Sequence, residues 1–414
     1  MRPEGSGDRV VITGVGLVTA LGPDRETTWA ALRRGESGAI RLDPATFEPG
    51  LAGFPALRAS PPLGGLDPAL DLLARASDEA MADAGLSGED RPYAPDRSAV
   101  LVGLSKGGIR SLAAVHQATR SGDPGSSPEL GRAWLQSWPG SGAAFVAGRF
   151  GFRGAALGPV AACATGLVAV LQGVDLIRRG ACDVALVGSA DASLEPLVLA
   201  AFRRMKVLAR VGENPKAAIR PWDAGRSGFL VGEGGAVLVL ERLDRAKGRG
   251  ASSYAEVAGG ALGSDAFHET ALGPDPAGLA RLIGRALADS GVEPGEIDAV
   301  NVHATATLGN DPLECRALRL ALGLDADRVL CSANKAQVGH LLGAAGSVEL
   351  ALAALGVARG VVPPTLNLDD PDPACDLRAV AEVARPWPIR ASLKLSLGFG
   401  GHFAAAVLRR VDPG

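Results

Sequence analysis

One cysteine and two histidines stand where proteins of alternating strands and helices usually gather their active-site residues. Cys163 occupies the segment GPVAACATGLVAV, at the start of a predicted helix. Unpaired backbone N–H groups and the helix dipole favour an anion there, so we expect a lowered thiol pKa and a nucleophilic role. His303 follows the apolar segment IDAVNV, and His340 opens another predicted helix. A cysteine with two histidines suits thiolate chemistry on acyl groups.

The remaining composition narrows the class of protein. The other four cysteines are interpreted as buried structural residues: Cys182, Cys315, Cys331 and Cys375. An odd count of five and the absence of metal-ligand spacing predict neither a disulfide framework nor a zinc site. The net charge of −3 gives no reason to expect nucleic acid. No stretch has signal-peptide character or the ~20 apolar residues of a membrane helix, so we expect a cytoplasmic location.

The chain of 414 residues, 47% of them hydrophobic, can bury a large core. Apolar strand-like segments such as SAVLVGLS and DVALVGSADA alternate with helical patterns, which predicts a mostly parallel sheet covered on both faces. The segments CATGLVAV after Cys163 and HLLGAAGS after His340 echo one another, since each leads a reactive residue into a Gly- and Ala-rich helix. We therefore expect a duplication, with halves 1–250 and 251–414 forming one compact unit.

Several long motifs in a fixed order carry a resemblance to a known family. They are VVITGVGLVTALG, AACATG, NPKAAIRPWDAGRSGFLVGEGGAVLVLE, VHATAT, NKAQVGHLLGAAGSVE, PPTLNLDDPDP and SLGFGG. With them the chain resembles, nearly end to end, the β-ketoacyl-acyl carrier protein synthases, the elongating condensing enzymes of fatty acid and polyketide assembly. The resemblance implies a thiolase-like α/β fold, with duplicated halves in a five-layered αβαβα arrangement.

The resemblance also implies the reaction and its partners. An acyl thioester would be condensed with malonyl-acyl carrier protein in a decarboxylative Claisen reaction. No metal or organic cofactor is expected, because phosphopantetheine arrives on the acyl carrier protein. The chain would form a homodimer, or a heterodimer with a related ketosynthase subunit.

Catalytic roles transfer to matching positions. By resemblance, Cys163 takes the acyl chain from a carrier thioester. His303 and His340 assist decarboxylation of the malonyl group and stabilise the enolate. Lys335, in the K-x-x-x-G-H motif, supports the second histidine. Neutral histidines can donate hydrogen bonds to an enolate oxygen without a metal.

Five further positions match supporting roles. Asp311 and Glu349 match acidic partners in the polar network around the lysine. Thr305 and Thr307 match the threonines that hold the phosphopantetheine arm. Phe399, in GFGG, matches a gating aromatic whose backbone N–H joins that of Cys163 in an oxyanion hole.

The chain also departs from the family pattern. HATATLG has alanines where many members have glycines, and we expect the pantetheine contacts to survive the extra methyl groups. Phe403, after GFGG, stands where many family members have a polar side chain.

Lys106 falls at or beside an aliphatic position that, by resemblance, borders the acyl pocket, and Phe202 is also assigned to that pocket. A lysine there would disfavour a long apolar chain and favour an unusual or short primer. The alternative is that Lys106 points to solvent.

A basic segment follows Phe202 and includes Arg203, Arg204 and Lys206. It is interpreted as a docking patch for an acidic carrier protein, with a solvated surface as the alternative.

Three competing functions fit the sequence less well. A thiolase would carry a second cysteine in the loop that here reads LGFGGHF, and a chain-initiating enzyme would have Asn in place of His340. A non-catalytic partner subunit typically lacks the nucleophile, so Cys163 argues against it.

Overall fold

The computed structural model describes residues 9–43, 53–59, 66–88, 90–121 and 128–411. Ten strands form one mixed sheet in the order β10-β9-β13-β14-β8-β1-β7-β6-β4-β5. Five of them come from the first part of the chain: β1 (Val10–Val18), β4 (Ser98–Gly103), β5 (Ala156–Leu157), β6 (Val184–Asp191) and β7 (Gly234–Arg242). Five come from the second part: β8 (Ala255–Ser264), β9 (Ile297–Asn301), β10 (Leu330–Ser332), β13 (Ala391–Gly398) and β14 (His402–Arg409).

The two sets of five strands have the same pairing pattern. In the first set β1–β7 and β6–β7 are antiparallel, while β4–β6 and β4–β5 are parallel. In the second set β8–β14 and β13–β14 are antiparallel, while β9–β13 and β9–β10 are parallel. The sets join through a short β1–β8 pairing at Val11–Glu256 and Ile12–Ala255. The duplication is therefore visible in the topology, and we propose that the halves meet near residue 250.

The expectation of a mostly parallel sheet was wrong. β13 and β14 are joined by the tight Gly-rich turn at 399–401, which forces antiparallel pairing because no crossover helix lies between them. The alternation of strands and helices in the sequence does not show which strands pair.

Within the described residues, twelve α-helices surround the strands or fill the space between them. They are α1 (Arg25–Arg33), α2 (Pro68–Asp83), α3 (Ile109–Arg120), α4 (Pro128–Gln136), α5 (Ser141–Phe150), α6 (Thr165–Arg178), α7 (Pro196–Arg204), α8 (Leu243–Gly248), α9 (Ala277–Ser290), α10 (Asn310–Leu322), α11 (Lys335–Val338) and α12 (Ala345–Arg359). Two small two-stranded sheets lie outside the main one: β2 (Ile40–Arg41) with β3 (Pro55–Ala56), and β11 (Val361–Val362) with β12 (Arg385–Pro386).

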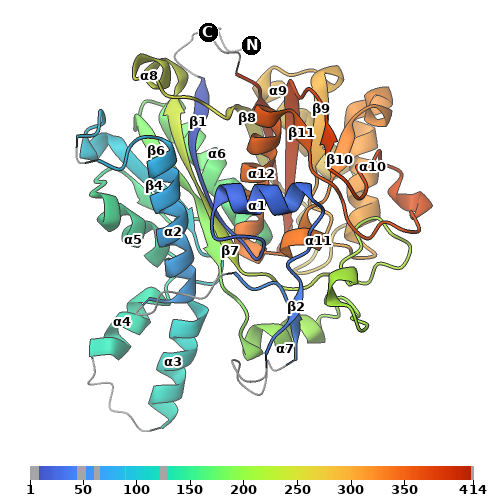
Figure 1. The fold of residues 1–414 in the computed structure, drawn as a ribbon, viewed down its shortest axis with the longest axis horizontal. Coiled ribbons are helices and arrows are strands. Elements are labelled where there is room, and N and C mark those ends of the chain that lie inside the picture. The colour runs from blue at the N-terminus through green and yellow to red at the C-terminus, as the bar shows by residue number, and fades with distance from the viewer. Residues whose placement is uncertain (1–8, 44–52, 60–65, 89, 122–127, 412–414) are drawn as a thin grey trace.

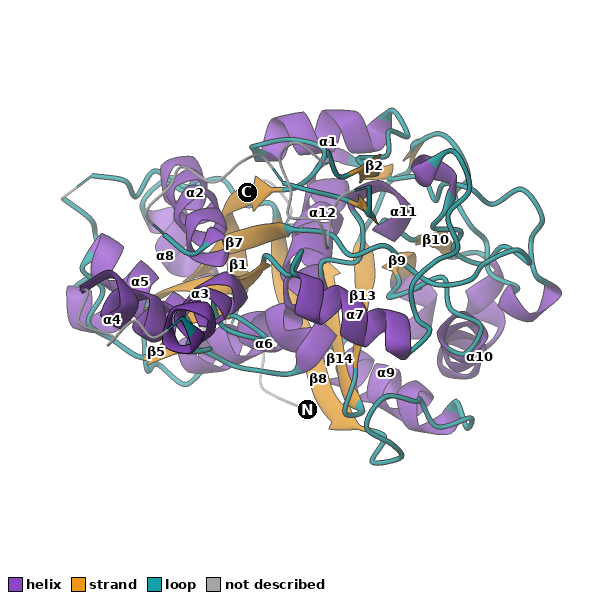
Figure 2. Ribbon diagram, turned by 90° about the horizontal axis from the view of Figure 1, so that it is seen from below, coloured by secondary structure: helices purple, strands orange, loops and turns teal. Residues whose placement is uncertain are grey.

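The helices and strands form five layers. α6 and α12 each contact strands of both sets and lie between them (Figure 2). α2 and α5 cover the outer face of the first set, and α9 covers that of the second with α10 packed on it. α3 and α4 project from this body as an arm (Figure 1). The arrangement is the αβαβα order expected from the sequence.

Helix α12 is apolar enough to resemble a membrane span, in the window Leu342–Arg359. In this fold 89% of that window is buried, so α12 is a core helix between the two sets of strands.

The first turns of α6 and α12 approach one another closely. A Cβ at Gly166 would lie 2.5 Å from the backbone nitrogen of Ser347, and one at Gly346 would lie 2.5 Å from that of Leu167. The Ser189 and Ser347 hydroxyl oxygens are 2.7 Å apart beside this contact. The glycines therefore allow the starts of two helices from different halves to share one region of the core.

The two helix starts do repeat one local structure, but the residues that correspond differ from those expected from the sequence. Ala162 and Leu342 both have left-handed backbone conformations, with φ of 45° and 47°, and a short 3-10 turn begins at each. Helices α6 and α12 begin three residues after them. The counterpart of Cys163 is therefore Gly343, not His340.

Candidate active site

Cys163 lies in the 3-10 turn Ala162–Ala164, directly before α6, and only 6% of the residue is exposed. The hydroxyl of Thr165 accepts the N–H of Ala161 at 2.9 Å and donates to the carbonyl of Ala162 at 2.8 Å. These two bonds hold the strained turn, because Ala162 has a positive φ. The position of Cys163 is thus fixed by local hydrogen bonds.

The Gly-rich turn after β13 lies against Cys163. A Cβ at Gly398 would lie 2.7 Å from the carbonyl oxygen of Ala161 and 3.1 Å from the backbone nitrogen of Cys163. The backbone N–H of the next residue, Phe399, points to the Cys163 sulfur. Two backbone donors, from Cys163 and Phe399, therefore lie near the thiol, as an oxyanion hole requires.

The expectation of a lowered thiol pKa was wrong. Burial raises the pKa of Cys163 to about 11, and the charges of Lys106 and Lys335 with the Phe399 N–H offset only part of this effect. The helix start supplies donors, but desolvation of the thiolate is the larger effect in so closed a site. The resting residue is a thiol at neutral pH.

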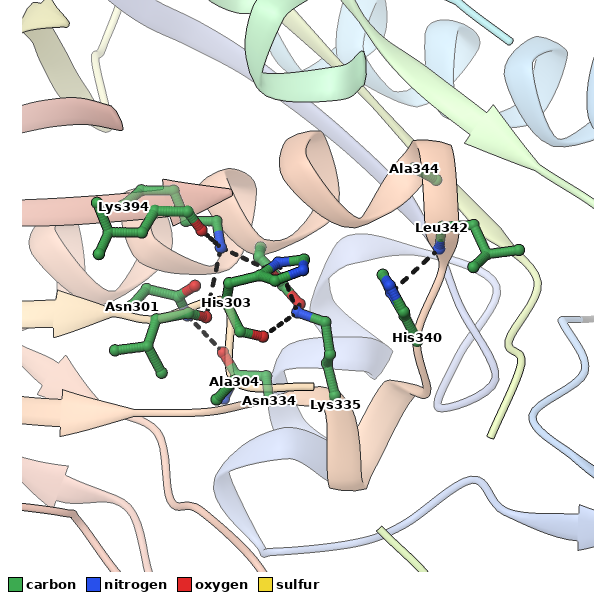
Figure 3. Close-up of polar contacts among 12 residues, drawn as sticks. Asn301, His303, Ala304, Asn334, Lys335, His340, Leu342, Ala344 and Lys394 are labelled. Carbon is green, nitrogen blue, oxygen red and sulfur yellow. Dashed lines mark hydrogen bonds and ion pairs between the residues drawn. The ribbon is translucent and has the colours of Figure 1, made fainter. Parts of the chain in front are cut away.

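His340 is buried, and its backbone bridges Val231 in a parallel pairing. The backbone N–H of Leu342 donates to His340 Nδ1 at 3.3 Å (Figure 3). An accepting Nδ1 assigns the proton of the neutral ring to Nε2. The ring of Phe229 packs edge-on at 4.7 Å between centroids. His340 therefore presents Nε2–H as a donor.

His303 follows β9 and lies 5.4 Å from the His340 ring, between centroids. Its Nδ1 is 3.4 Å from the Nζ of Lys335, an ammonium that can only donate, so the His303 proton is also assigned to Nε2 (Figure 3). Burial, and then the nearby charge of Lys335, holds the pKa of each histidine well below its usual range. Both rings are therefore neutral donors at neutral pH.

Glu314, on α10, holds the backbone of the His303 strand end. Its carboxylate accepts the N–H of His303 at 2.6 Å and that of Ala304 at 2.8 Å. The residue is fully buried, and burial raises its pKa to about 7. Glu314 was not predicted from the sequence, although its spacing of three from Asp311 places both residues on one helix face.

Lys335 donates to Glu349 Oε1 at 2.6 Å and to the carbonyl oxygen of His303. The other oxygen of Glu349 binds Lys394, a buried residue of β13 that sequence reasoning also missed. Asp311 accepts the backbone N–H of Trp222 at 3.1 Å and binds Asn310, and the charge of Lys335 acts on its carboxyl group. Lys335 therefore pairs with Glu349, and Asp311 supports the neighbouring loop.

A cavity of about 610 Å³ brings the predicted residues together. Its walls include Cys163, His303, His340, Phe399, Thr305 and Thr307. The two threonine hydroxyl oxygens lie 2.9 Å apart. Exposed residues Leu308, Gly309 and Arg316 also line it, so the cavity reaches from the surface to Cys163.

Comparison with known proteins decides the family. Residues 7–246 match the model described as "Beta-ketoacyl synthase, N-terminal domain", and residues 254–369 match "Beta-ketoacyl synthase, C-terminal domain". The chain belongs to the β-ketoacyl synthase family. It is an acyltransferase of fatty acid or type II polyketide biosynthesis, a 3-oxoacyl-acyl carrier protein synthase.

Relatives from both pathways are similar over nearly the full length. A putative polyketide beta-ketoacyl synthase 1 of Streptomyces cyaneus is 37% identical, with 97% of each chain covered. A 3-oxoacyl-[acyl-carrier-protein] synthase 2 of Rhizobium meliloti is 36% identical, with 97% of this chain and 99% of the relative covered.

Solved structures agree. A type II polyketide ketosynthase in complex with its acyl-carrier protein and bound to the hexaketide has a TM-score of 0.88 and 31% identity, covering 98% of this chain and 99% of that chain. The ishigamide ketosynthase/chain length factor has a TM-score of 0.87 and 33% identity, with the same coverage.

The remaining predicted residues of this β-ketoacyl synthase lie around the same centre. Phe202, on α7, joins the apolar cluster that contains Cys163, and its ring is 5.8 Å from that of Phe229 and 6.4 Å from that of Phe399. Lys106 turns inward to Asp191 rather than to open solvent. Its role and that of Phe202 in an acyl pocket remain predictions.

The predicted docking residues Arg203, Arg204 and Lys206 are exposed at the end of α7. Val207, directly after them, lines the cavity. The basic residues therefore stand beside the route to Cys163.

Proposed function

We propose that this synthase elongates a carrier-bound acyl chain with Cys163 as acyl acceptor and with His303 and His340 as paired hydrogen-bond donors. The observation that carries this proposal is the shared cavity, in which the thiol and both neutral rings face one space. The complete set of reactive residues favours a catalytic subunit over a non-catalytic partner.

Acylation comes first. The Cys163 sulfur attacks the carbonyl carbon of the acyl thioester, and the carbonyl oxygen becomes an oxyanion near the N–H groups of Cys163 and Phe399. The bond to the carrier sulfur breaks, and that sulfur leaves with the proton of the Cys163 thiol. Loss of one such donor typically costs ~2.7–4 kcal/mol of barrier stabilisation.

Condensation follows on a malonyl thioester held by Thr305 and Thr307. The bond between the α-carbon and the carboxylate breaks, carbon dioxide leaves, and the thioester oxygen gains negative charge as an enolate. The Nε2–H groups of His303 and His340 donate to that oxygen. The enolate carbon then attacks the Cys163 thioester, a carbon–carbon bond forms, and the Cys163 sulfur leaves and takes up a proton.

We further propose that the acyl carrier protein docks on Arg203, Arg204 and Lys206. Their exposure beside the cavity supports this, as does the complex of a similar ketosynthase with its carrier. The reduced, buried state of all five cysteines supports a cytoplasmic location.

A dimer is the proposed working form. β5 is the edge strand of the main sheet, with Leu157 and nearby Val160 about half exposed. Trp134, Leu135 and Trp138, on or just after α4, are exposed to a similar extent. Such apolar surface favours burial against a second ketosynthase subunit, of the same or a related chain. A monomeric mass in light scattering at micromolar concentration would contradict a homodimer.

Intact-mass measurement tests the catalytic proposal. Wild-type enzyme incubated with acyl-carrier thioesters should gain the mass of one acyl group, and Cys163→Ala should gain none. An adduct that persists in the variant would overturn the assignment of the nucleophile.

A further inference from the structure

Lys106 is a charged residue close to the nucleophile that the reaction above does not use. It follows β4, and 29% of its side chain is exposed. Its Nζ lies 2.7 Å from Asp191 Oδ2 and 2.8 Å from Ser105 Oγ. The side chain is thus turned inward and held in one place by two acceptors.

Asp191 connects this lysine to the catalytic turns. It is the last residue of β6, and it also accepts the N–H of Gly343 at 3.1 Å and the hydroxyl of Ser193. Gly343 follows Leu342, whose N–H orients His340. Ser105 packs on the same turn, since a Cβ at Gly343 would lie 2.6 Å from Ser105 Cβ. Lys106 therefore stands beside the turn that positions His340.

The position of Lys106 relative to the cavity indicates which part of a substrate the lysine can contact. Lys106 does not line the cavity that runs from the surface past Thr305 and Thr307 to Cys163. Its positive charge nevertheless acts on both Cys163 and His340. It therefore lies near Cys163 without lining the route by which a carrier arm would enter. An acyl group on Cys163 extends away from the arm that delivered it.

Apolar residues pack in one cluster with Cys163, among them Leu194, Leu199, Phe229, Val231 and Leu342. An ammonium has three N–H donors, and Asp191 and Ser105 take up two. Among the residues that the structure describes, no third acceptor is bound to Lys106. A saturated chain would cover this open donor without satisfying it, whereas an oxygen on the chain would accept from it.

We propose that Lys106 is a specificity-determining residue that donates a hydrogen bond to an oxygen carried by the acyl group on Cys163. The preferred acyl group then bears a keto, hydroxyl or carboxyl oxygen on the carbons nearest the thioester. Before Cys163 is acylated, Asp191 holds the ammonium of Lys106 in place and balances its charge. The inference rests on the proposed acylation of Cys163, and it adds the chemical class of the acyl chain.

The test compares acyl groups matched in length. Butyryl, 3-hydroxybutyryl and 3-oxobutyryl carriers, with the hexanoyl and 3-oxohexanoyl pair, are incubated with enzyme, and the rate of Cys163 acylation is followed by intact mass. A charge-assisted hydrogen bond predicts a preference for the oxygenated chain of about tenfold or more at each length. The 3-oxo and 3-hydroxy probes show which oxygen is preferred.

Variants separate hydrogen bonding from space filling. Lys106→Met keeps the approximate length of the side chain and should bring the ratio of acylation rates for oxygenated and saturated chains close to one. Lys106→Arg should keep most of the wild-type ratio. Lys247→Met, at an exposed site on α8, is the matched control and should change nothing. If Lys106→Met does not fold, Lys106→Met with Asp191→Asn removes the buried carboxylate charge as well.

Equal rates for oxygenated and saturated chains in the wild type, or an undiminished preference in Lys106→Met, would overturn the inference. A wild type that accepts all three four-carbon chains and rejects both six-carbon chains would also overturn it, because Lys106 would then only limit length. Failure of every probe to acylate Cys163 would instead refute the proposed function.

Discussion

Lys335 and Lys394 bind opposite oxygens of one carboxylate, that of Glu349, in the fully buried centre of the protein. Each ammonium also donates to a backbone carbonyl, Lys335 to that of His303 and Lys394 to that of Leu395 at 2.6 Å. Burial, only partly offset by Glu349, lowers the pKa of Lys394 to about 8. Two cations thus share one carboxylate near His303 and His340, and their charges favour neutral rings.

Replacing Lys394 should change how activity depends on pH. In Lys394→Met the loss of a nearby positive charge raises the pKa of His303 and His340, so the acid limb of the decarboxylation rate should move to higher pH. The readout is carbon dioxide release from malonyl-carrier between pH 4.5 and 8. Lys247→Met should keep the wild-type profile. An unmoved acid limb in a folded Lys394→Met enzyme would show that this charge does not act on the histidines.

Glu314 should make stability depend on pH. Its folded pKa of about 7 lies above the ordinary value of 4.5, so the stability it contributes is complete below about pH 4.5 and is lost as pH rises through 7. The shift corresponds to about 3 kcal/mol across that range. In Glu314→Gln this dependence should disappear, while the loss of one backbone acceptor costs ~1–3 kcal/mol at every pH.

Urea unfolding of wild type and Glu314→Gln at pH 5 and pH 8 measures this difference. The wild type should lose more stability than the variant between the two values. Equal losses would mean that Glu314 does not titrate in the folded state within this range.

The sequence was sufficient to identify candidate site residues that lie in short local motifs, such as Cys163 and His303. Lys394 and Glu314 were missed because their importance depends on packing between distant segments. Lys394 reaches the site because β13 pairs in parallel with β9, which places it opposite Asn301, two residues before His303. That strand pairing is not visible in the alternation of strands and helices.

Asp311 and Glu314 show a second limit. They lie three residues apart on α10, so sequence periodicity places them on one face without showing which one reaches the His303 backbone. The rotation of α10 against the sheet decides this, and it gives the contact to Glu314. The expected thiol pKa was wrong for a similar reason. The pKa is raised by the burial of Cys163, and that burial depends on how both halves of the chain pack around the residue.

Charge reversal of the proposed docking residues should weaken carrier recognition without damaging the cavity around Cys163. Arg203→Glu with Arg204→Glu should raise the KM for acyl carrier protein by about tenfold at low salt, and the effect should shrink as salt increases. Steady-state condensation at several carrier concentrations and ionic strengths provides the measurement. Arg245→Glu with Lys247→Glu, on exposed α8, is the matched control. Equal KM values for the two double variants would exclude this patch as the carrier site.

The close approach of α6 and α12 should make Gly166 intolerant of a side chain. A Cβ there would lie 2.4 Å from Ser189 Oγ and 2.5 Å from the Ser347 nitrogen, so Gly166→Ala must separate the two helix starts. Overpacking of this kind typically costs 1–3 kcal/mol of unfolding free energy. Because Cys163 and the His340 turn precede these helices, a shift of about 1 Å should also slow acylation by about 100-fold.

Gly284→Ala is the matched control. Gly284 lies in the exposed middle of α9 with open space around it, so the substitution should stabilise the protein by about 0.5–1 kcal/mol. Thermal unfolding and the acylation rate of both variants check this contrast, and a Gly166→Ala enzyme with wild-type stability and rate would show that the helix contact does not hold the site together.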